Sequence, residues 1–329
     1  MRTAFCGKGG SGKTSIATLF TQYIVQQGLE TLAIDGDINQ HLGEALVLNG
    51  LLDEDKLATL PRLGECLEEM QNFLHGYNTH IHAADQIIES TPAGRGSNFV
   101  TLDGTSVINT KFMLQQNNLR FMAMGGHGES DVGTTCYHKF TGALGSFLNH
   151  LLDKSDDMVI ADMCAGADPF ASSGLASRFD TLFLICEPTK KSLAVFDQAV
   201  HYSQYHDLKL YVIGNKIENA EDEDYIRSYV GDYYLTGFSV QTAFKKAERG
   251  QAYTLDDLSD ATKASLATML DMTRQNKVRD WKKYQRTGLF FHERAAEGWA
   301  SAMYGVDMMQ QHDPEFDYNT LYQTTQKAA

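Results

Sequence analysis

Apolar runs alternate along most of the chain with segments whose apolar residues recur at helical spacing. The runs have the length of buried strands; they are residues 2–6, 30–35, 157–162, 181–186 and 208–213, with a further strand that ends at Met124. Helical spacing is clearest in Ile16, Leu19, Phe20, Tyr23 and Ile24, and helices are also expected near 192–205 and 255–273. Strands that alternate with helices predict an α/β fold, a mainly parallel sheet with helices on both faces.

The first of these strands leads directly into a glycine-rich loop, residues 7–14, whose sequence GKGGSGKT fits the pattern G-x-x-x-x-G-K-[ST]. Strand, loop and helix stand in the order that a phosphate-binding loop requires; a glycine turn between strand and helix is the alternative. Backbone N–H groups of such a loop close around phosphate oxygens, and the helix N-terminus adds a partial positive charge. We expect Lys13 to reach the β- and γ-phosphates and the Thr14 hydroxyl to ligate Mg²⁺. The residues expected to hold the nucleotide are Gly7, Lys8, Gly9, Gly10, Ser11, Gly12, Lys13, Thr14 and Ser15.

Acidic and amide side chains stand at the ends of three predicted strands. Asp35 and Asp37 close the second strand, Asp162 ends a later one, and Asn215 follows the last. Ligands of α/β sheets bind at the carboxyl ends of the strands, so these side chains are expected beside the glycine loop. Two simpler roles stay open: the aspartates could cap a helix that begins near His41, and Asn215 could serve a strand-end turn.

Lys8 indicates which class of phosphate-binding loop this sequence contains. A lysine directly after the first glycine, in the form K-G-G-x-G-K-T, resembles the deviant Walker A motif of the dimeric ATPases of the MinD, ParA, nitrogenase iron protein and CooC group. The resemblance implies ATP-dependent dimerisation, in which Lys8 reaches across a homodimer to the partner's nucleotide. It makes Lys8 and Lys13 catalytic residues; a solvated surface lysine is the alternative for Lys8.

Two of the strand ends resemble switch segments of the same family. The run Asp-Gly-Asp-Ile-Asn is similar to the family's D-x-D-P-N switch I, which implies that Asp37 orients the attacking water, with Ile38 in place of the proline. The run Asp-Met-Cys-Ala-Gly resembles the Walker B aspartate and switch II. This implies that Asp162 holds Mg²⁺ through water and that the Gly166 amide senses the γ-phosphate.

The resemblance extends to the adenine end of the site. Asn215 and Lys216 form the Asn-Lys pair that reads adenine in the family, and the donor and acceptor of a side-chain amide match the edge of that base. Pro188, which follows the strand 181–186, is a further nucleotide-binding candidate.

The segment 121–152 resembles the CooC-type ATPases, which insert nickel into carbon monoxide dehydrogenase. Those proteins carry a Cys-x-Cys before a similar helix, whereas this chain carries Cys136 and His138. Two chains about a dyad would supply two cysteines and two histidines, a set that suits tetrahedral Zn²⁺ and also Ni²⁺. The alternatives are a free thiol beside a surface histidine, or a shared 4Fe–4S cluster held by Cys136 and Cys164 as in the nitrogenase iron protein.

Composition restricts the possible binding partners and the cellular location of the protein. The 329 residues include 42 acidic and 28 basic ones, a formal charge of −14 that opposes contact with nucleic acid or anionic lipid. The scattered cysteines do not form a disulfide framework. No apolar stretch reaches the roughly 18 residues of a membrane span, and the first residues lack the apolar core of a signal peptide. We therefore expect a cytoplasmic protein.

The chain is expected to divide into a P-loop ATPase domain, residues 1–273 with a variable segment at 49–118, and a helical C-terminal extension, residues 274–329. The run 274–286 is rich in Lys and Arg, and on a helix it would form a basic face that could bind DNA or membrane. Because Trp281 and further aromatic residues accompany the charges, we expect the extension to pack on the body or on a protein partner instead.

These patterns together favour a homodimeric ATPase that binds ATP and Mg²⁺ and acts in metallocentre maturation or metal delivery to a client metalloenzyme. A positioning ATPase of the ParA or MinD type, which binds DNA or membrane, is the alternative. A second alternative is an iron–sulfur electron donor. Metal analysis of the purified dimer separates the three.

Overall fold

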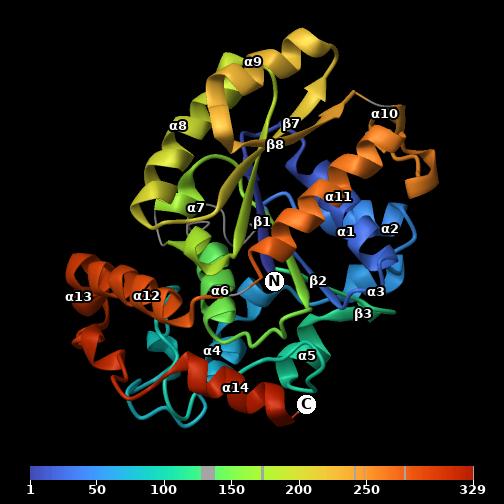
Figure 1. Cartoon of the computed structure of the whole chain (residues 1–329). Helices are drawn as coiled ribbons and strands as arrows, with labels where there is room; N and C mark the ends of the chain where they lie inside the picture. Colours follow the sequence, from blue (N-terminus) through green and yellow to red (C-terminus); the bar gives the residue numbers. More distant parts are fainter. Residues whose placement is uncertain (127–137, 172–173, 241, 248, 278, 329) are drawn as a thin grey trace.

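The structure is a computed structural model that describes residues 1–126, 138–171, 174–240, 242–247, 249–277 and 279–328, with side chains up to residue 324. Its centre is an eight-stranded sheet of order β3-β4-β2-β5-β1-β6-β7-β8 (Figure 1). The strands are β1 (Arg2–Gly7), β2 (Thr31–Gly36), β3 (Leu114–Gln116), β4 (Leu119–Ala123), β5 (Met158–Met163), β6 (Thr181–Cys186), β7 (Leu210–Ile217) and β8 (Tyr234–Ser239). Strand β3 pairs antiparallel with β4, and the other pairings are parallel, which confirms the expected fold class.

Helices cover both faces of this sheet. The α-helices are α1 (Lys13–Gln26), α2 (His41–Leu48), α3 (Glu54–Thr59), α4 (Leu67–His75), α5 (Val107–Phe112), α6 (His138–Asn149), α7 (Asp168–Ala171), α8 (Lys190–Tyr205), α9 (Ala220–Val230), α10 (Thr242–Ala247), α11 (Asp260–Gln275), α12 (Trp281–Ala295), α13 (Ser301–Tyr304) and α14 (Tyr318–Ala328). Helices α1, α2 and α11 pack in one apolar core, whereas α4, α6, α8 and α9 pack in the other. None of the helices in the described part of the chain combines the length and apolar character needed to cross a bilayer.

Strand β1 shows why the sheet can be covered on both sides. Its side chains alternate between the two cores, with Ala4 and Cys6 in one and Phe5 in the other, and all three are buried. The strand lies between β5 and β6 and is parallel to both. A strand buried on both faces reads as a continuous apolar run, and this pattern made it recognisable in the sequence.

Two of the expected boundaries were wrong, and local capping explains both. A helix was expected over 255–273. Residues 255–257 instead form a single 3₁₀ turn, and α11 begins only at Asp260, because the Ser259 hydroxyl caps it by accepting the Thr262 N–H. The basic run 274–286 is not one helix. Helix α11 ends at Gln275, and α12 begins after Asp280, whose carboxylate accepts the Lys283 N–H.

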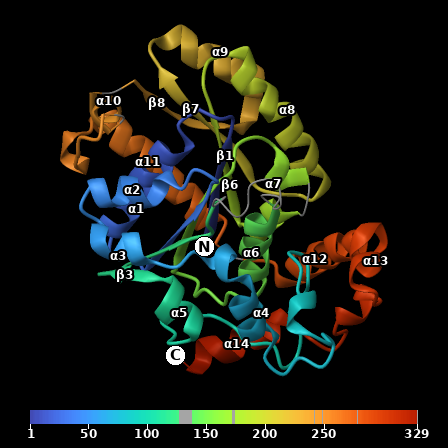
Figure 2. The ribbon, with the colours of Figure 1, turned by 180° about the vertical axis from the view of Figure 1, so that it is seen from behind.

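The C-terminal extension packs against the body through aromatic side chains. Trp281 is buried and stacks on Tyr318 of α14 at a centroid distance of 5.5 Å. The Tyr284 hydroxyl donates to the carbonyl of Leu148 in α6 at 2.9 Å. Figure 2 shows α12 and α13 on the same side of the molecule as α6. The Trp281–Tyr318 stack holds the extension together, whereas Tyr284 and Phe316, whose ring stacks on Phe99 at 6.0 Å, dock the extension on the body.

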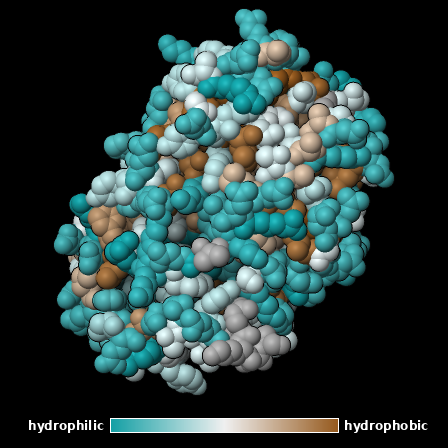
Figure 3. Space-filling view, viewed as in Figure 1, coloured by the Kyte–Doolittle hydropathy of each residue, from teal (hydrophilic) through white to brown (hydrophobic). Residues whose placement is uncertain are grey.

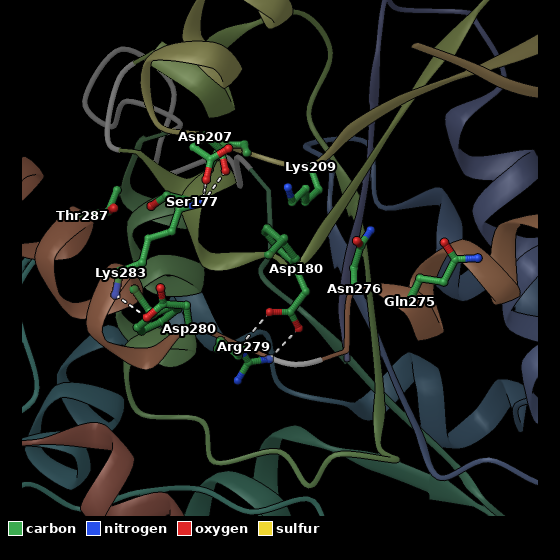
Figure 4. A pocket seen from close by; sticks show the side chains of 13 residues that line it. Ser177, Asp180, Asp207, Lys209, Gln275, Asn276, Arg279, Asp280, Lys283 and Thr287 are labelled. Atoms are coloured by element: carbon green, nitrogen blue, oxygen red, sulfur yellow. Dashed lines mark hydrogen bonds and ion pairs between the residues drawn. The ribbon is translucent and has the colours of Figure 1, made fainter. Parts of the chain in front are cut away.

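A buried ion cluster ties the extension to the first strand. Arg279 donates to Asp180 at 2.8 Å and to Asp153 at 2.9 and 3.0 Å, and Asp153 also pairs with Arg2 at 2.8 Å. Figure 4 shows the Arg279 guanidinium directed at Asp180, beside a cavity of about 300 Å³. Asp180 precedes β6 and Arg2 begins β1, so the cluster lies at the amino ends of these strands, away from the glycine loop. Its position indicates a structural role.

Candidate nucleotide-binding site

The glycine loop borders a cavity of about 550 Å³ at the carboxyl ends of the strands. Gly12 has φ +92° and stands directly before α1, and a Cβ on it would lie 2.2 Å from Asn215 Nδ2. Only glycine fits this position, because the backbone is left-handed and the space is taken. The residues that line the cavity are Gly9, Gly10, Gly12, Lys13, Thr14, Ser15, Asp37, Asn39, His41, Ala165, Asn215, Lys216, Val240, Phe244 and Lys245.

Three lysines surround the loop, and they differ in environment. Lys13 begins α1 and is only 6% exposed, although it lines the cavity. Lys8 is half-buried and forms no ion pair within the described part of the chain. Lys216 is already engaged, since its Nζ donates to the carbonyl of Gly10 at 2.7 Å and lies 2.6 Å from Glu187 Oε1. Of the three, Lys13 and Lys216 line the cavity and Lys8 does not, so the expected roles of Lys8 and Lys13 toward phosphate stay predictions.

Thr14 and Asp162 meet directly, as expected for a magnesium site. The Thr14 hydroxyl donates to Asp162 Oδ2 at 2.5 Å, and the buried Oδ1 of Asp162 has no hydrogen-bond partner. Burial raises the pKa of Asp162 to about 7. A carboxylate and a hydroxyl are the hard oxygen ligands that Mg²⁺ prefers, and a cation would relieve the burial of the Asp162 charge. The two side chains therefore fit Mg²⁺.

The two aspartates after β2 have different roles. Asp35 Oδ2 accepts the N–H groups of Leu42 at 2.9 Å and Gly43 at 3.3 Å, so this residue caps α2. Asp37 lines the nucleotide cavity, and its Oδ1 accepts from both the backbone and the side-chain amide of Asn39 at 3.0 Å. The capping role left open from the sequence thus applies to Asp35, whereas Asp37 faces the site.

Gly166 is near the loop, but its amide has a partner. The Gly166 N–H donates to the carbonyl of Gly7 at 3.0 Å. Contact between this amide and a γ-phosphate would therefore require an exchange of hydrogen-bond partners. The position agrees with the sequence prediction, while the proposed contact itself stays a prediction.

Asn215, the residue expected to read adenine, is buried, and its Nδ2 donates to the carbonyl of Ser11 at 2.8 Å. Its Oδ1 has no partner and remains available as an acceptor. Pro188 lies beyond β6, inside a tight turn closed by a 2.7 Å bond from Thr189 N–H to the carbonyl of Glu187, and it is absent from the described lining of the cavity. Asn215 thus lines the cavity and Pro188 is not brought to it, while the contact of Asn215 with adenine stays a prediction.

Sequence reasoning missed six residues of the cavity wall: Asn39, His41 and Ala165, which stand in or beside the predicted switch segments, and three that no predicted motif adjoins. Val240 follows β8, and Phe244 and Lys245 belong to α10, a six-residue helix. No motif in the sequence marks them, because they reach the site only through the pairing of β8 with β7. They extend the wall next to Asn215 with an aromatic ring and a cation.

Of the two residues expected to bind a transition metal, Cys136 and His138, the structure describes only His138. Cys136 lies outside the described residues, whereas His138 begins α6, is exposed, and has its Nε2 3.7 Å from Asp168 Oδ2. Cys164 is buried, which raises the pKa of its thiol to about 12 and disfavours the thiolate that a cluster needs. Within the described residues no group of three or more His, Cys, Asp and Glu side chains is arranged to hold a metal ion.

Comparison with known proteins agrees with this geometry. Residues 3–264 match the model of the CobQ/CobB/MinD/ParA nucleotide binding domain. An uncharacterized ATP-binding protein of Methanocaldococcus jannaschii is 26% identical over 226 residues, 69% of this chain and 82% of that protein. The carbon monoxide dehydrogenase accessory protein CooC of Rhodospirillum rubrum is 25% identical over 241 residues, 72% of this chain and 82% of that protein.

Solved structures share the fold at low identity. The cell division ATPase MinD of Pyrococcus furiosus superposes with a TM-score of 0.54 and 16% identity, over 83% of this chain and 98% of that one. MinD of Pyrococcus horikoshii, solved with Mg-ADP, gives a TM-score of 0.53 and 17% identity over 84% and 98%. With the family match, the glycine cradle and the Thr14–Asp162 pair, the chain belongs to the CobQ/CobB/MinD/ParA family of P-loop nucleotide-binding domains.

Proposed function

We propose that the protein is an ATP-hydrolysing switch that closes as a homodimer on ATP and acts in metallocentre maturation or metal delivery. The nucleotide part is supported by the cavity in which Lys13, Thr14, Asp37 and Asn215 converge. The metallocentre part is supported by the similarity to a carbon monoxide dehydrogenase accessory protein and by the Cys-x-His run that leads into α6. Soluble action in the cytoplasm is part of the same proposal.

The described side chains suit water attack on a γ-phosphate. Asp37 is held by Asn39 at the cavity wall and orients the water. Thr14 and Asp162 hold Mg²⁺, which supplies positive charge to the phosphate oxygens when bound. Lys13 adds a fixed cation from the floor of the site. Phosphoryl transfer depends on this kind of positioning and charge stabilisation, since the protein itself does little covalent chemistry.

Replacing Lys8 tests the dimer. In Lys8→Ala, ATP should still bind, because Lys13 and the loop amides stay in place. Turnover should fall by about a hundredfold to a thousandfold, as for the loss of one group that stabilises transition-state charge. The ATP-dependent dimer should also be lost. Phosphate release and light scattering with and without ATP measure both effects.

Lys191→Ala is the matched control, since Lys191 is an exposed lysine of α8. It should leave turnover and dimerisation unchanged. A Lys8→Ala protein that dimerises and hydrolyses ATP like the unaltered chain would show that the deviant Walker A assignment is wrong.

Replacing Cys136 tests the metal. Two ligands per chain cannot close a tetrahedral site, so one Zn²⁺ or Ni²⁺ per dimer is expected, bound only when the dimer forms. Cys136→Ser should abolish metal binding and leave basal ATP turnover unchanged, while Cys66→Ser serves as the control thiol. Elemental analysis of the isolated dimer gives the stoichiometry. One metal per monomer in a monomeric sample would point to other ligands, and iron with sulfide would favour the electron-donor alternative.

The positioning-ATPase alternative depends on the basic run 274–286. Arg279 is committed to the buried ion cluster, Lys283 pairs with Asp207 at 2.9 Å, and Lys277 lies 3.6 Å from Asp156. These pairs leave few of the charges for DNA or lipid, so we expect no binding to either at physiological salt. Salt-sensitive, ATP-dependent co-sedimentation with DNA or anionic vesicles would instead support the alternative.

A further inference from the structure

A large, mainly apolar cavity lies away from the nucleotide site. It has a volume of about 750 Å³ and lies between the body and the C-terminal extension. The body contributes Ile87, Ile88 and the first turns of α6, and the extension contributes side chains from 291–304. The family match ends at residue 264, so the extension wall is an addition to the family's nucleotide-binding domain.

We propose that this cavity binds a small amphipathic anion, a molecule with an aliphatic or aromatic body and one anionic group. The volume is within the range of roughly 300 to 1,000 Å³ that is usual for small-molecule sites. Apolar side chains dominate the wall, among them Ile87, Ile88, Phe291, Trp299 and Met303. Trp299 is 49% exposed and Met303 71% exposed, so an apolar body would cover surface that now faces water. Figure 3 shows apolar side chains at the surface over α12 and α13.

The walls of the cavity are built and held in place. Gln71, itself buried, donates to the carbonyl of Ile87 at 2.7 Å, and the Ser146 hydroxyl donates to the carbonyl of Ile88 at 3.2 Å. On the extension side, the buried His292 ring lies 2.9 Å from the carbonyl of Met308 and 3.3 Å from the Ser90 hydroxyl. A ligand would therefore meet a largely preformed site and would not have to order it.

Two cations give the site its charge preference. Lys139 and Arg294 both line the cavity, and neither forms an ion pair with any described residue. Each lies over an aromatic ring, Lys139 at 5.4 Å from the Phe140 centroid and Arg294 at 5.4 Å from that of Phe290. The lining also holds one carboxylate, Glu89, so its two cations outnumber its acidic groups although the whole chain has a net charge of −14. An anionic head at the rim with an apolar body inside matches both features.

The test uses the full chain without nucleotide, so it does not depend on ATP hydrolysis or on the proposed metal. Dodecanoate is titrated by calorimetry, with dodecanol as the uncharged analogue. A Trp281→Phe background leaves Trp299 as the single tryptophan, whose emission should shift as the ligand covers it. We expect saturable binding of one dodecanoate per chain and about tenfold weaker binding of dodecanol, the ratio for one charge-assisted contact at a partly exposed rim.

A pair of glycines supplies the matched variants. Gly142 lines the cavity, and a Cβ on it would approach its nearest neighbour, Glu89 Cβ, at an ordinary 3.8 Å, so Gly142→Leu fills the space without a backbone clash. Gly298 is exposed and is not itself a lining residue, although Trp299 follows it, and a Cβ built on it has nothing within 4 Å. Gly142→Leu should abolish binding, and Gly298→Leu should keep it. Unchanged affinity in Gly142→Leu, or no saturable binding in the unaltered chain, overturns the proposal.

The charge preference has its own variants. Lys139→Gln with Arg294→Gln should weaken dodecanoate about tenfold and leave dodecanol unchanged. Arg286→Gln is the control, because Arg286 is an exposed arginine of the same helix as Arg294 and does not line the cavity. Equal affinity for dodecanoate and dodecanol in the unaltered chain would overturn the assignment of an anionic ligand.

Discussion

Lys13→Ala is expected to lower the rate of ATP hydrolysis by about a hundredfold to a thousandfold and to weaken ATP binding as well. Lys13 begins α1, is almost fully buried, and lines the same cavity as Asp37. A cation held in a low-dielectric site stabilises the developing charge of the transferred phosphoryl group more than a solvated cation does. Single-turnover phosphate release gives the rate, and a fluorescent ATP analogue gives the affinity.

Lys282→Ala is the appropriate control, since Lys282 is an exposed lysine of α12, far from the glycine loop in sequence and on a different element. It should leave both quantities unchanged. Lys13 and Lys8 are distinguished by binding, because Lys8→Ala is expected to keep ATP affinity and Lys13→Ala to lose it. Normal hydrolysis by Lys13→Ala would mean that the loop does not hold the reacting phosphates.

The nucleotide site was predictable from sequence because each of its parts obeys a local rule. Gly12 is needed where the backbone is left-handed and Asn215 fills the space of a Cβ. Asp162 ends a strand that is apolar over its whole length, so its position at the sheet edge follows from the strand itself. Local conformation and burial depend mainly on residues that are adjacent in the sequence. The loop, the strands and the acidic strand ends could therefore be predicted together.

Features that depend on distant packing could not be found in this way. Phe244 reaches the cavity only because β8 pairs with β7, and the sequence pattern around β8 was not recognised as a strand, since most of its residues are only half-buried. The Gly166–Gly7 hydrogen bond joins residues that are far apart in the chain. Helical spacing alone also could not show that Asp280 would cap a new helix and divide the basic run.

The buried ion pairs of Arg279 also depend on distant packing and could not be predicted from sequence. They lead to a prediction about stability. In sequence it is one member of a basic run, but in the structure its side chain is 9% exposed and contacts two carboxylates, Asp153 and Asp180. Arg279→Leu should lower the free energy of unfolding by about 3–5 kcal/mol, because breaking a buried ion pair leaves charge without compensation. The loss should be cooperative with the body, since Asp153 also holds Arg2 of β1.

The pH dependence identifies the cause of this loss. Burial alone would raise the pKa of Asp153, but the charges of Arg2 and Arg279 outweigh it and hold that pKa well below its ordinary value of 3.8. A carboxylate with a depressed folded pKa adds stability that is complete above the unfolded pKa and is lost as the pH falls through the folded value. The difference in unfolding free energy between the unaltered chain and Arg279→Leu should therefore be full at pH 7 and shrink below about pH 4.

Urea denaturation across this pH range measures that difference. Arg274→Leu is the control, because Arg274 is exposed and its contact with Asp271 is 3.9 Å. That control should change stability by no more than about 0.5 kcal/mol. If Arg279→Leu lost the same amount at every pH, lost packing and not the ion cluster would account for the effect.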